Sequence, residues 1–271
     1  MTREEKLQEV LAKEVYDARD LVTIVELLRL PGGCPWDMEQ THKSLRRDMI
    51  EETYEVVEAI DADDPVLLRE ELGDALLQIV MHARIEEEAG RATFDEIAGD
   101  VCRKMIHRHP HVFGDVKAES VGEVLANWED IKSAEKSRTT LTDKLTSIPK
   151  QFPALMRAAK VGKKAKALDF PSTASVAEKL REELAEVEAA IAEGDENAVF
   201  EEMGDLLLTC ASLARFAGVD PEHALSAATD KFITRFATVE ALALAKGADI
   251  VSMSDADKDI LWQEAKKTAK K

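Results

Sequence analysis

Residues 51–55 read Glu-Glu-Thr-Tyr-Glu and residues 71–74 read Glu-Leu-Gly-Asp, with fifteen residues between the two motifs. The same arrangement returns 131 positions later, as Glu-Glu-Leu-Ala-Glu at residues 182–186 and Glu-Met-Gly-Asp at residues 202–205. Self-similarity at a fixed displacement is the signature of a repeated structural unit. The sequence therefore predicts two related units in tandem.

The apolar residues around these motifs follow helical spacing. Leu180, Leu184, Val187 and Ile191 recur every three or four residues, and a similar stripe runs through the first copy. This spacing is typical of amphipathic helices that turn one face toward a core, and the chain has no sustained alternation of the kind that marks strands. We expect about ten helices and no sheet, which is an all-α fold of two tandem helical bundles.

Helix ends can be placed around the fifteen-residue spacers. Asp64-Pro65 fits a capping residue followed by proline at the first helical position, and Gly194 fits a C-terminal stop. The spacer is then long enough for the helix that carries the second motif to fold back on the helix that carries the first. Each copy is predicted to form an antiparallel helical hairpin.

The hairpins would bring acidic side chains together, because residues three apart on a helix share a face. Carboxylates about 4 Å apart repel by about 1 kcal/mol in water and by more when partly buried, so we expect a cation between them. A purely oxygen-donor set favours Mg²⁺, with Mn²⁺ as a possible substitute. The candidate ligands are Glu52, Glu55, Glu71 and Asp74 in the first copy and Glu183, Glu186, Glu202 and Asp205 in the second.

A glycine sits beside the aspartate of each hairpin, Gly73 in the first copy and Gly204 in the second. Glycine inside a helix costs about 1 kcal/mol relative to alanine. Its recurrence predicts the close approach of a neighbouring helix or ligand, and a merely tolerated glycine is the alternative.

A Lys-x-x-x-Arg motif, and after it a Trp-x-x-x-Lys motif, follow each hairpin in the same order. A Lys-x-x-x-Arg pair places two cations on one helical face, as a polyphosphate requires, although solvated surface bases are the alternative. The tryptophans could stack on a base or anchor a helix in the core. The candidate nucleotide-binding residues are Lys231, Arg235, Trp262 and Lys266 in the second copy and Lys104 and Arg108 in the first, where Trp128 and Lys132 form the Trp-x-x-x-Lys motif.

Charge and hydropathy along the chain indicate which partners to expect and where the domains end. The 271 residues carry a formal net charge of −18, which repels phosphate backbones, so we expect no nucleic-acid partner. The charged N-terminus and the interrupted apolar runs predict no membrane association and a cytoplasmic protein. We place the domains at residues 1–137 and 153–271, with a linker at 138–152 that shows little apolar periodicity.

These motifs, together with Cys-Pro-Trp-Asp-Met-Glu-Gln-Thr-His at residues 34–42 and Arg-His-Pro-His-Val-Phe at 108–113, resemble the MazG family of nucleoside triphosphate pyrophosphohydrolases in its tandem two-domain form. The resemblance implies the all-α fold of that family, Mg²⁺ dependence, and hydrolysis of NTPs and dNTPs to the monophosphate and pyrophosphate. It also implies a homodimer and a housecleaning role against noncanonical or surplus nucleotides.

The same resemblance assigns the eight carboxylates to Mg²⁺ and the basic and tryptophan residues of the second copy to the nucleotide. Ala198 departs from the pattern, because some relatives carry a basic residue four positions before the ligand that corresponds to Glu202. Glu51 and Glu182, next to the ligands, are candidate general bases or outer carboxylates. Which copy turns over substrate is left open.

Two other functions fit the same residues. A non-catalytic helical protein could bind nucleotides or a partner through the acidic faces and act in regulation. A specialised relative could hydrolyse dUTP or phosphoribosyl-ATP.

Overall fold

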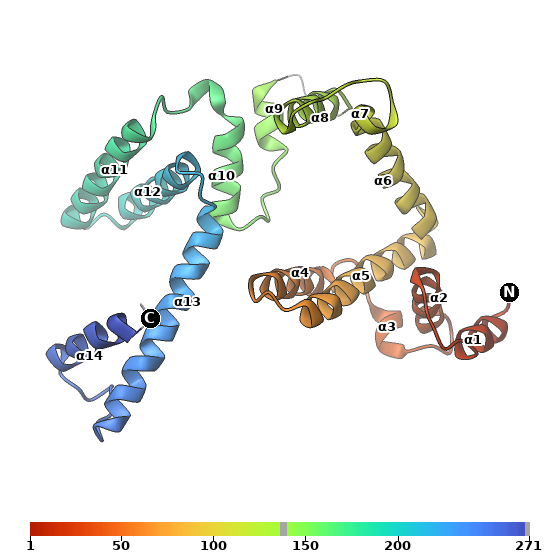
Figure 1. Cartoon of the computed structure of the whole chain (residues 1–271), viewed down its shortest axis with the longest axis horizontal. Coiled ribbons are helices and arrows are strands. Elements are labelled where there is room, and N and C mark those ends of the chain that lie inside the picture. The colour runs from red at the N-terminus through yellow and green to blue at the C-terminus, as the bar shows by residue number, and fades with distance from the viewer. Residues whose placement is uncertain (136–139, 269–271) are drawn as a thin grey trace. The chain divides into compact units, whose positions relative to one another are not determined.

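The computed structural model describes residues 1–135 and 140–268, and within those ranges helices joined by turns and loops are present and no strand is. The chain divides into two compact units, Met1–Lys132 and Ser133–Lys271 (Figure 1). None of the described helices combines the length and the apolar character that a bilayer span requires. The prediction of an all-α fold with tandem helical units is confirmed.

The helices of the first unit are α1 (Arg3–Leu11), α2 (Ala18–Arg29), α3 (Pro35–Glu39), α4 (Arg46–Asp61), α5 (Pro65–Glu88), α6 (Phe94–Arg108), α7 (Pro110–Phe113) and most of α8 (Val121–Glu135). Those of the second unit are α9 (Leu141–Thr146), α10 (Ala154–Lys164), the 3₁₀ turn η1 (Lys166–Leu168), α11 (Thr173–Glu193), α12 (Glu196–Phe216), α13 (Pro221–Ala245) and α14 (Asp255–Thr268).

Both predicted hairpins form. In the first unit α4 packs on α5, and the Asp64 carboxylate caps α5 by accepting hydrogen bonds from the backbone N–H groups of Val66 and Leu67. In the second unit α11 packs on α12, and α11 ends at Gly194 in the left-handed conformation, with φ of 74°. A side chain would be strained there, so glycine ends the helix at little cost.

Each unit has a small core of buried apolar residues. In the first unit, Val25 of α2 and Leu45 pack with Val80 and Met81 of α5. In the second, Val239 of α13 belongs to a cluster that joins α13 to α14. The first hairpin therefore packs against its core through α5, whereas in the second unit α12 packs against α10. Both hairpins also carry exposed apolar and acidic residues.

The structure departs from the sequence prediction in detail. It has fourteen α-helices among the described residues rather than about ten, because α3, α7 and α9 are too short for apolar periodicity to reveal them. Helix α9 lies inside the range that we assigned to a linker. The predicted boundary between residues 137 and 138 lies outside the described residues and stays a prediction.

Candidate metal centre

Three carboxylates converge on each hairpin. Glu52 and Glu55 of α4 and Glu71 of α5 each offer one oxygen, and these oxygens lie within 4.8 Å of one another. All three side chains are partly buried. In the second unit, Glu183 and Glu186 of α11 and Glu202 of α12 form the same group. The repeated spacing thus produces the same cluster twice.

The fourth predicted ligand of each copy stands apart from these groups. Asp74 and Asp205 are exposed, and neither belongs to the set of oxygens within 4.8 Å. Asp74 nevertheless lies near enough for its charge to help raise the pKa of Glu52. The assignment of both aspartates as metal ligands stays a prediction.

Electrostatics in the first cluster favour a bound cation. Burial, followed by the charge of Asp74 and then by that of Glu55, raises the pKa of Glu52, and burial followed by the charge of Glu55 raises the pKa of Glu71. A hydrogen bond from Gln78 opposes the shift at Glu52. Like charges that raise one another's pKa are stabilised when a positive ion lies between them. The all-oxygen donor set fits Mg²⁺ or Mn²⁺.

The second cluster contains a lysine that sequence reasoning missed. The Nζ atom of Lys179 lies 2.8 Å from Glu183, 2.7 Å from Glu182 and 3.9 Å from Glu186. Hydrogen bonds to Glu182 and Glu183 raise the pKa of Lys179, so this side chain stays positively charged. The signal was present in the sequence, because Lys179 lies four residues before Glu183 and therefore shares its helical face.

The two glycines correct one of our predictions. A Cβ atom added to Gly73 or to Gly204 would meet no atom of the described chain within 4 Å. The close approach of a neighbouring helix of the same chain is therefore wrong, because both positions open onto free space.

The nucleotide-binding candidates of the second unit gather on another pair of helices. Lys231 and Arg235 lie on α13, and Trp262 and Lys266 lie on α14, which packs against α13. The Trp262 ring lies 5.2 Å from that of Phe232, and both line a hollow of about 330 Å³. Within the described part of the chain, no ion pair joins α13 or α14 to the carboxylates of α11 and α12.

In the first unit the corresponding basic pair is split. Lys104 is exposed, whereas Arg108 is only 7% exposed and its guanidinium carbon lies 5.4 Å from the centre of the Trp128 ring. Arg108 is thus packed against the tryptophan of its own unit. The Arg108 guanidinium therefore lies against the ring of Trp128, which is the surface that a nucleotide base would need for stacking.

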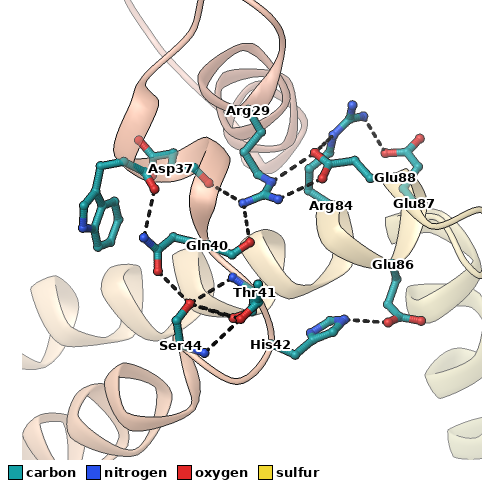
Figure 2. A network of polar contacts seen from close by, with 11 residues as sticks. Arg29, Asp37, Gln40, Thr41, His42, Ser44, Arg84, Glu86, Glu87 and Glu88 are labelled. Atoms are coloured by element: carbon teal, nitrogen blue, oxygen red, sulfur yellow. Dashed lines mark hydrogen bonds and ion pairs between the residues drawn. The ribbon is translucent and has the colours of Figure 1, made fainter.

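Residues 34–42, which precede α4, are linked by hydrogen bonds and ion pairs to the C-terminal end of α5 (Figure 2). Arg29, 9% exposed, donates to Glu88 of α5 at 3.0 and 2.8 Å and to the carbonyl groups of Asp37 and Gln40. His42 lies 2.6 Å from Glu86, also on α5. The motif therefore has a structural role that its sequence did not reveal.

Comparisons with known proteins place both carboxylate hairpins in matched regions. The family model described as the MazG nucleotide pyrophosphohydrolase domain matches residues 40–113 and 171–239. The chain is 42% identical to the nucleoside triphosphate pyrophosphohydrolase of Escherichia coli strain K12, over 91% of this chain and 96% of that protein. It is 41% identical to the nucleoside triphosphate pyrophosphohydrolase/pyrophosphatase MazG of Thermotoga maritima, over 91% and 94%.

A longer relative is also similar. Bacillus subtilis YabN is 45% identical over 92% of this chain, which spans 51% of that protein. The two matched segments each contain one complete carboxylate cluster at the same spacing. The chain belongs to the MazG family of nucleotide pyrophosphohydrolases, with two copies of its helical domain.

Proposed function

We propose that this protein hydrolyses nucleoside triphosphates, including dNTPs and noncanonical forms, to the monophosphate and pyrophosphate, and that it clears surplus or damaged nucleotides from the cytoplasmic pool. The observation that carries the proposal is the pair of carboxylate clusters, each on a hairpin inside a family-matched segment. The names of the Escherichia coli and Thermotoga maritima relatives support the same activity.

The chain's own residues define the mechanism. Glu183, Glu186 and Glu202, with Asp205 one turn after Glu202 on α12, would hold Mg²⁺ in the second unit, and Glu52, Glu55, Glu71 and Asp74 would hold it in the first. The chemistry that Mg²⁺ supplies when bound is charge neutralisation on the triphosphate and a lowered pKa of water. Water oxygen adds to the α-phosphorus, and the bond to the bridging oxygen breaks as pyrophosphate leaves.

Glu182 accepts the proton of the attacking water. This residue lies next to Glu183 on the exposed side of α11, within hydrogen-bond reach of a water molecule held at the cluster, and its carboxylate accepts a hydrogen bond from Lys179 at 2.7 Å. Glu51 has the same position in the first unit.

The second unit is the principal catalytic site in this proposal. Lys179 brings a permanent positive charge to within 3.9 Å of Glu186, where the phosphates arrive. Lys231 is exposed, and Arg235 has a buried Nε atom without a hydrogen-bond partner among the described residues. In the first unit, by contrast, Arg108 is packed on Trp128.

We infer that the protein forms a homodimer. Large apolar side chains on α11 and α12 are exposed, among them Ile191, Phe200 and Leu207. Exposed large apolar side chains on both helices of a hairpin favour an interface with a partner.

The activity is tested with a panel of NTPs and dNTPs in the presence of Mg²⁺, with chromatographic measurement of monophosphate and pyrophosphate. We expect turnover in the full-length protein and its loss in Glu52→Gln/Glu183→Gln. Glu188→Gln, an exposed glutamate of α11 outside the cluster, is the matched control. Retained turnover in the double variant would exclude a carboxylate mechanism.

The same panel separates the other functions. Nucleotide binding without turnover would indicate a regulatory protein. Turnover confined to dUTP or to phosphoribosyl-ATP would indicate a specialised relative.

A further inference from the structure

The two repeated clusters differ in the charge of one neighbouring side chain. The displacement of 131 residues that pairs Glu52 with Glu183 also pairs Asp48 with Lys179. Each of these residues lies four positions before the first ligand of its cluster, on the same face of its helix. The first hairpin thus has an acid where the second has a base.

The second cluster carries its own counter-ion. The Lys179 ammonium lies 2.8 Å from Glu183, whose residue is 4% exposed, and 3.9 Å from Glu186. A charge so placed neutralises part of the cluster before any metal arrives. A divalent ion that enters must displace this ammonium or bear its repulsion, which at such distances is substantial even in water.

The first cluster has no such cation. Among residues 1–135 and 140–268, no lysine or arginine forms an ion pair with Glu52, Glu55 or Glu71. The nearest pair in the sequence joins Arg47 to Glu51 at 3.8 Å, with both side chains mainly in solvent.

A buried amide also faces the first cluster. Gln78 of α5 is 8% exposed and hydrogen-bonds to Glu52, yet its Oε1 atom has no partner within the described chain. An unsatisfied buried oxygen is costly, and amide oxygens are ligands of hard cations. The corresponding residue of the second hairpin is Thr209, which is also buried.

We propose that the first cluster binds a divalent cation in the absence of nucleotide, whereas the second binds one only together with the nucleotide, whose phosphates draw Lys179 away from the carboxylates. The first ion is then resident, and the second enters with the substrate. The second half of this proposal rests on the function proposed above, and Asp48 and Lys179 set the difference.

The test is a titration of the full-length protein with Mn²⁺, followed by electron paramagnetic resonance of the free ion. We expect one bound Mn²⁺ per chain without nucleotide. A second, equally strong equivalent should appear when a dNTP analogue with an imido group between the α- and β-phosphorus is added. Glu52→Gln should remove the first equivalent, and Glu183→Gln should remove only the second.

Two exchanges of charge sharpen the test. Lys179→Met should let the second cluster bind Mn²⁺ without nucleotide, with an affinity at least about tenfold higher than that of the unmodified cluster. Asp48→Lys should weaken the first equivalent by a similar factor. Both substitutions lie on helix surfaces, and circular dichroism checks that the helices are retained. Arg47→Met, which alters an exposed cation on α4, is the control and should change neither equivalent.

The outcomes separate this inference from the proposed function. The inference would be overturned if the unmodified protein bound two Mn²⁺ ions equally tightly without nucleotide. It would also be overturned if Lys179→Met still bound only one Mn²⁺ without nucleotide. Neither result would contradict the proposed hydrolysis. If neither cluster binds Mn²⁺ under any condition, the inference and the metal-dependent mechanism both fail. If Mn²⁺ binds as described but the nucleotide panel gives no product, only the proposed activity fails.

Discussion

The two hairpins share their motif spacing and differ in what surrounds it. In the second, Lys179 lies among the carboxylates, and α13 and α14 carry the basic and aromatic candidates. In the first, the cluster lacks an internal cation among the described residues, and Arg29 and His42 fasten the preceding segment to the end of α5. The same carboxylate spacing is thus found twice in the chain with different charged neighbours, and this difference is the basis for our proposal that the second copy is the principal catalytic site.

The largest expected difference between the hairpins is catalytic. Glu183→Gln should lower kcat by about 100-fold or more, because it removes a buried carboxylate of the proposed ligand set from the site that also contains Lys179. Glu52→Gln should cause a clearly smaller loss. Steady-state kinetics on both variants measures the difference, with Glu188→Gln as the reference. A larger loss in Glu52→Gln would assign turnover to the first unit.

The next effect concerns the stability of the first unit alone. Arg29→Ala leaves two backbone carbonyl groups without their donor and leaves Glu88 with Arg84 as its remaining ion-pair partner. We therefore expect the free energy of unfolding to fall by about 2 kcal/mol, less than for a fully buried pair because Glu88 is partly exposed. Hydrogen exchange with mass spectrometry should show faster exchange in α2 to α5 and no change in α11 and α12. Arg47→Ala, at an exposed position, serves as the control. Equal acceleration in both units would mean that they unfold as one.

Acid should also act first on the first unit. Hydrogen bonds from Arg91, and then from His42, lower the pKa of Glu86 to about 2, and Arg29 lowers the pKa of Glu88. A carboxylate with a lowered pKa stabilises the fold above its unfolded pKa near 4.5, and this stabilisation is lost as the pH falls toward 2. Exchange rates measured between pH 5 and pH 2.5 should therefore rise in α5.

The second unit has a smaller set of such groups. Arg215 lowers the pKa of Asp169, which holds η1 to α12. Glu86→Gln should flatten the acid response of α5 and leave that of α12 unchanged. An unchanged response in α5 would show that the Glu86 contacts do not control it.

The smallest effect is expected at the two open glycines. Gly73→Ala and Gly204→Ala should each raise helix stability by about 0.5–1 kcal/mol in the isolated chain, because nothing in it lies within 4 Å of the new methyl group. Urea denaturation measures this gain, and sedimentation reports the dimer. Weaker association in either variant would place the second copy against that glycine. Destabilisation of the monomer would contradict the open environment.

Local sequence was sufficient to predict the two hairpins and the three carboxylates that converge on each of them. Asp64-Pro65 and Gly194 act through contacts within a few residues, and three-residue spacing on a helix fixes which carboxylates face one way. Lys179 was readable by the same rule and was overlooked. These features depend on helical geometry, which is the same wherever the helix lies.

The remaining features required the folded chain. Arg29 and Glu88 are 59 residues apart in the sequence, and His42 and Glu86 are 44 apart, so no local sequence pattern predicts either contact. The aspartates Asp74 and Asp205 share the spacing of ligands but stand outside the 4.8 Å groups, because side-chain direction and helix rotation set the final distances. Backbone periodicity specifies which residues share a face. The packing of one helix against another specifies which of them meet.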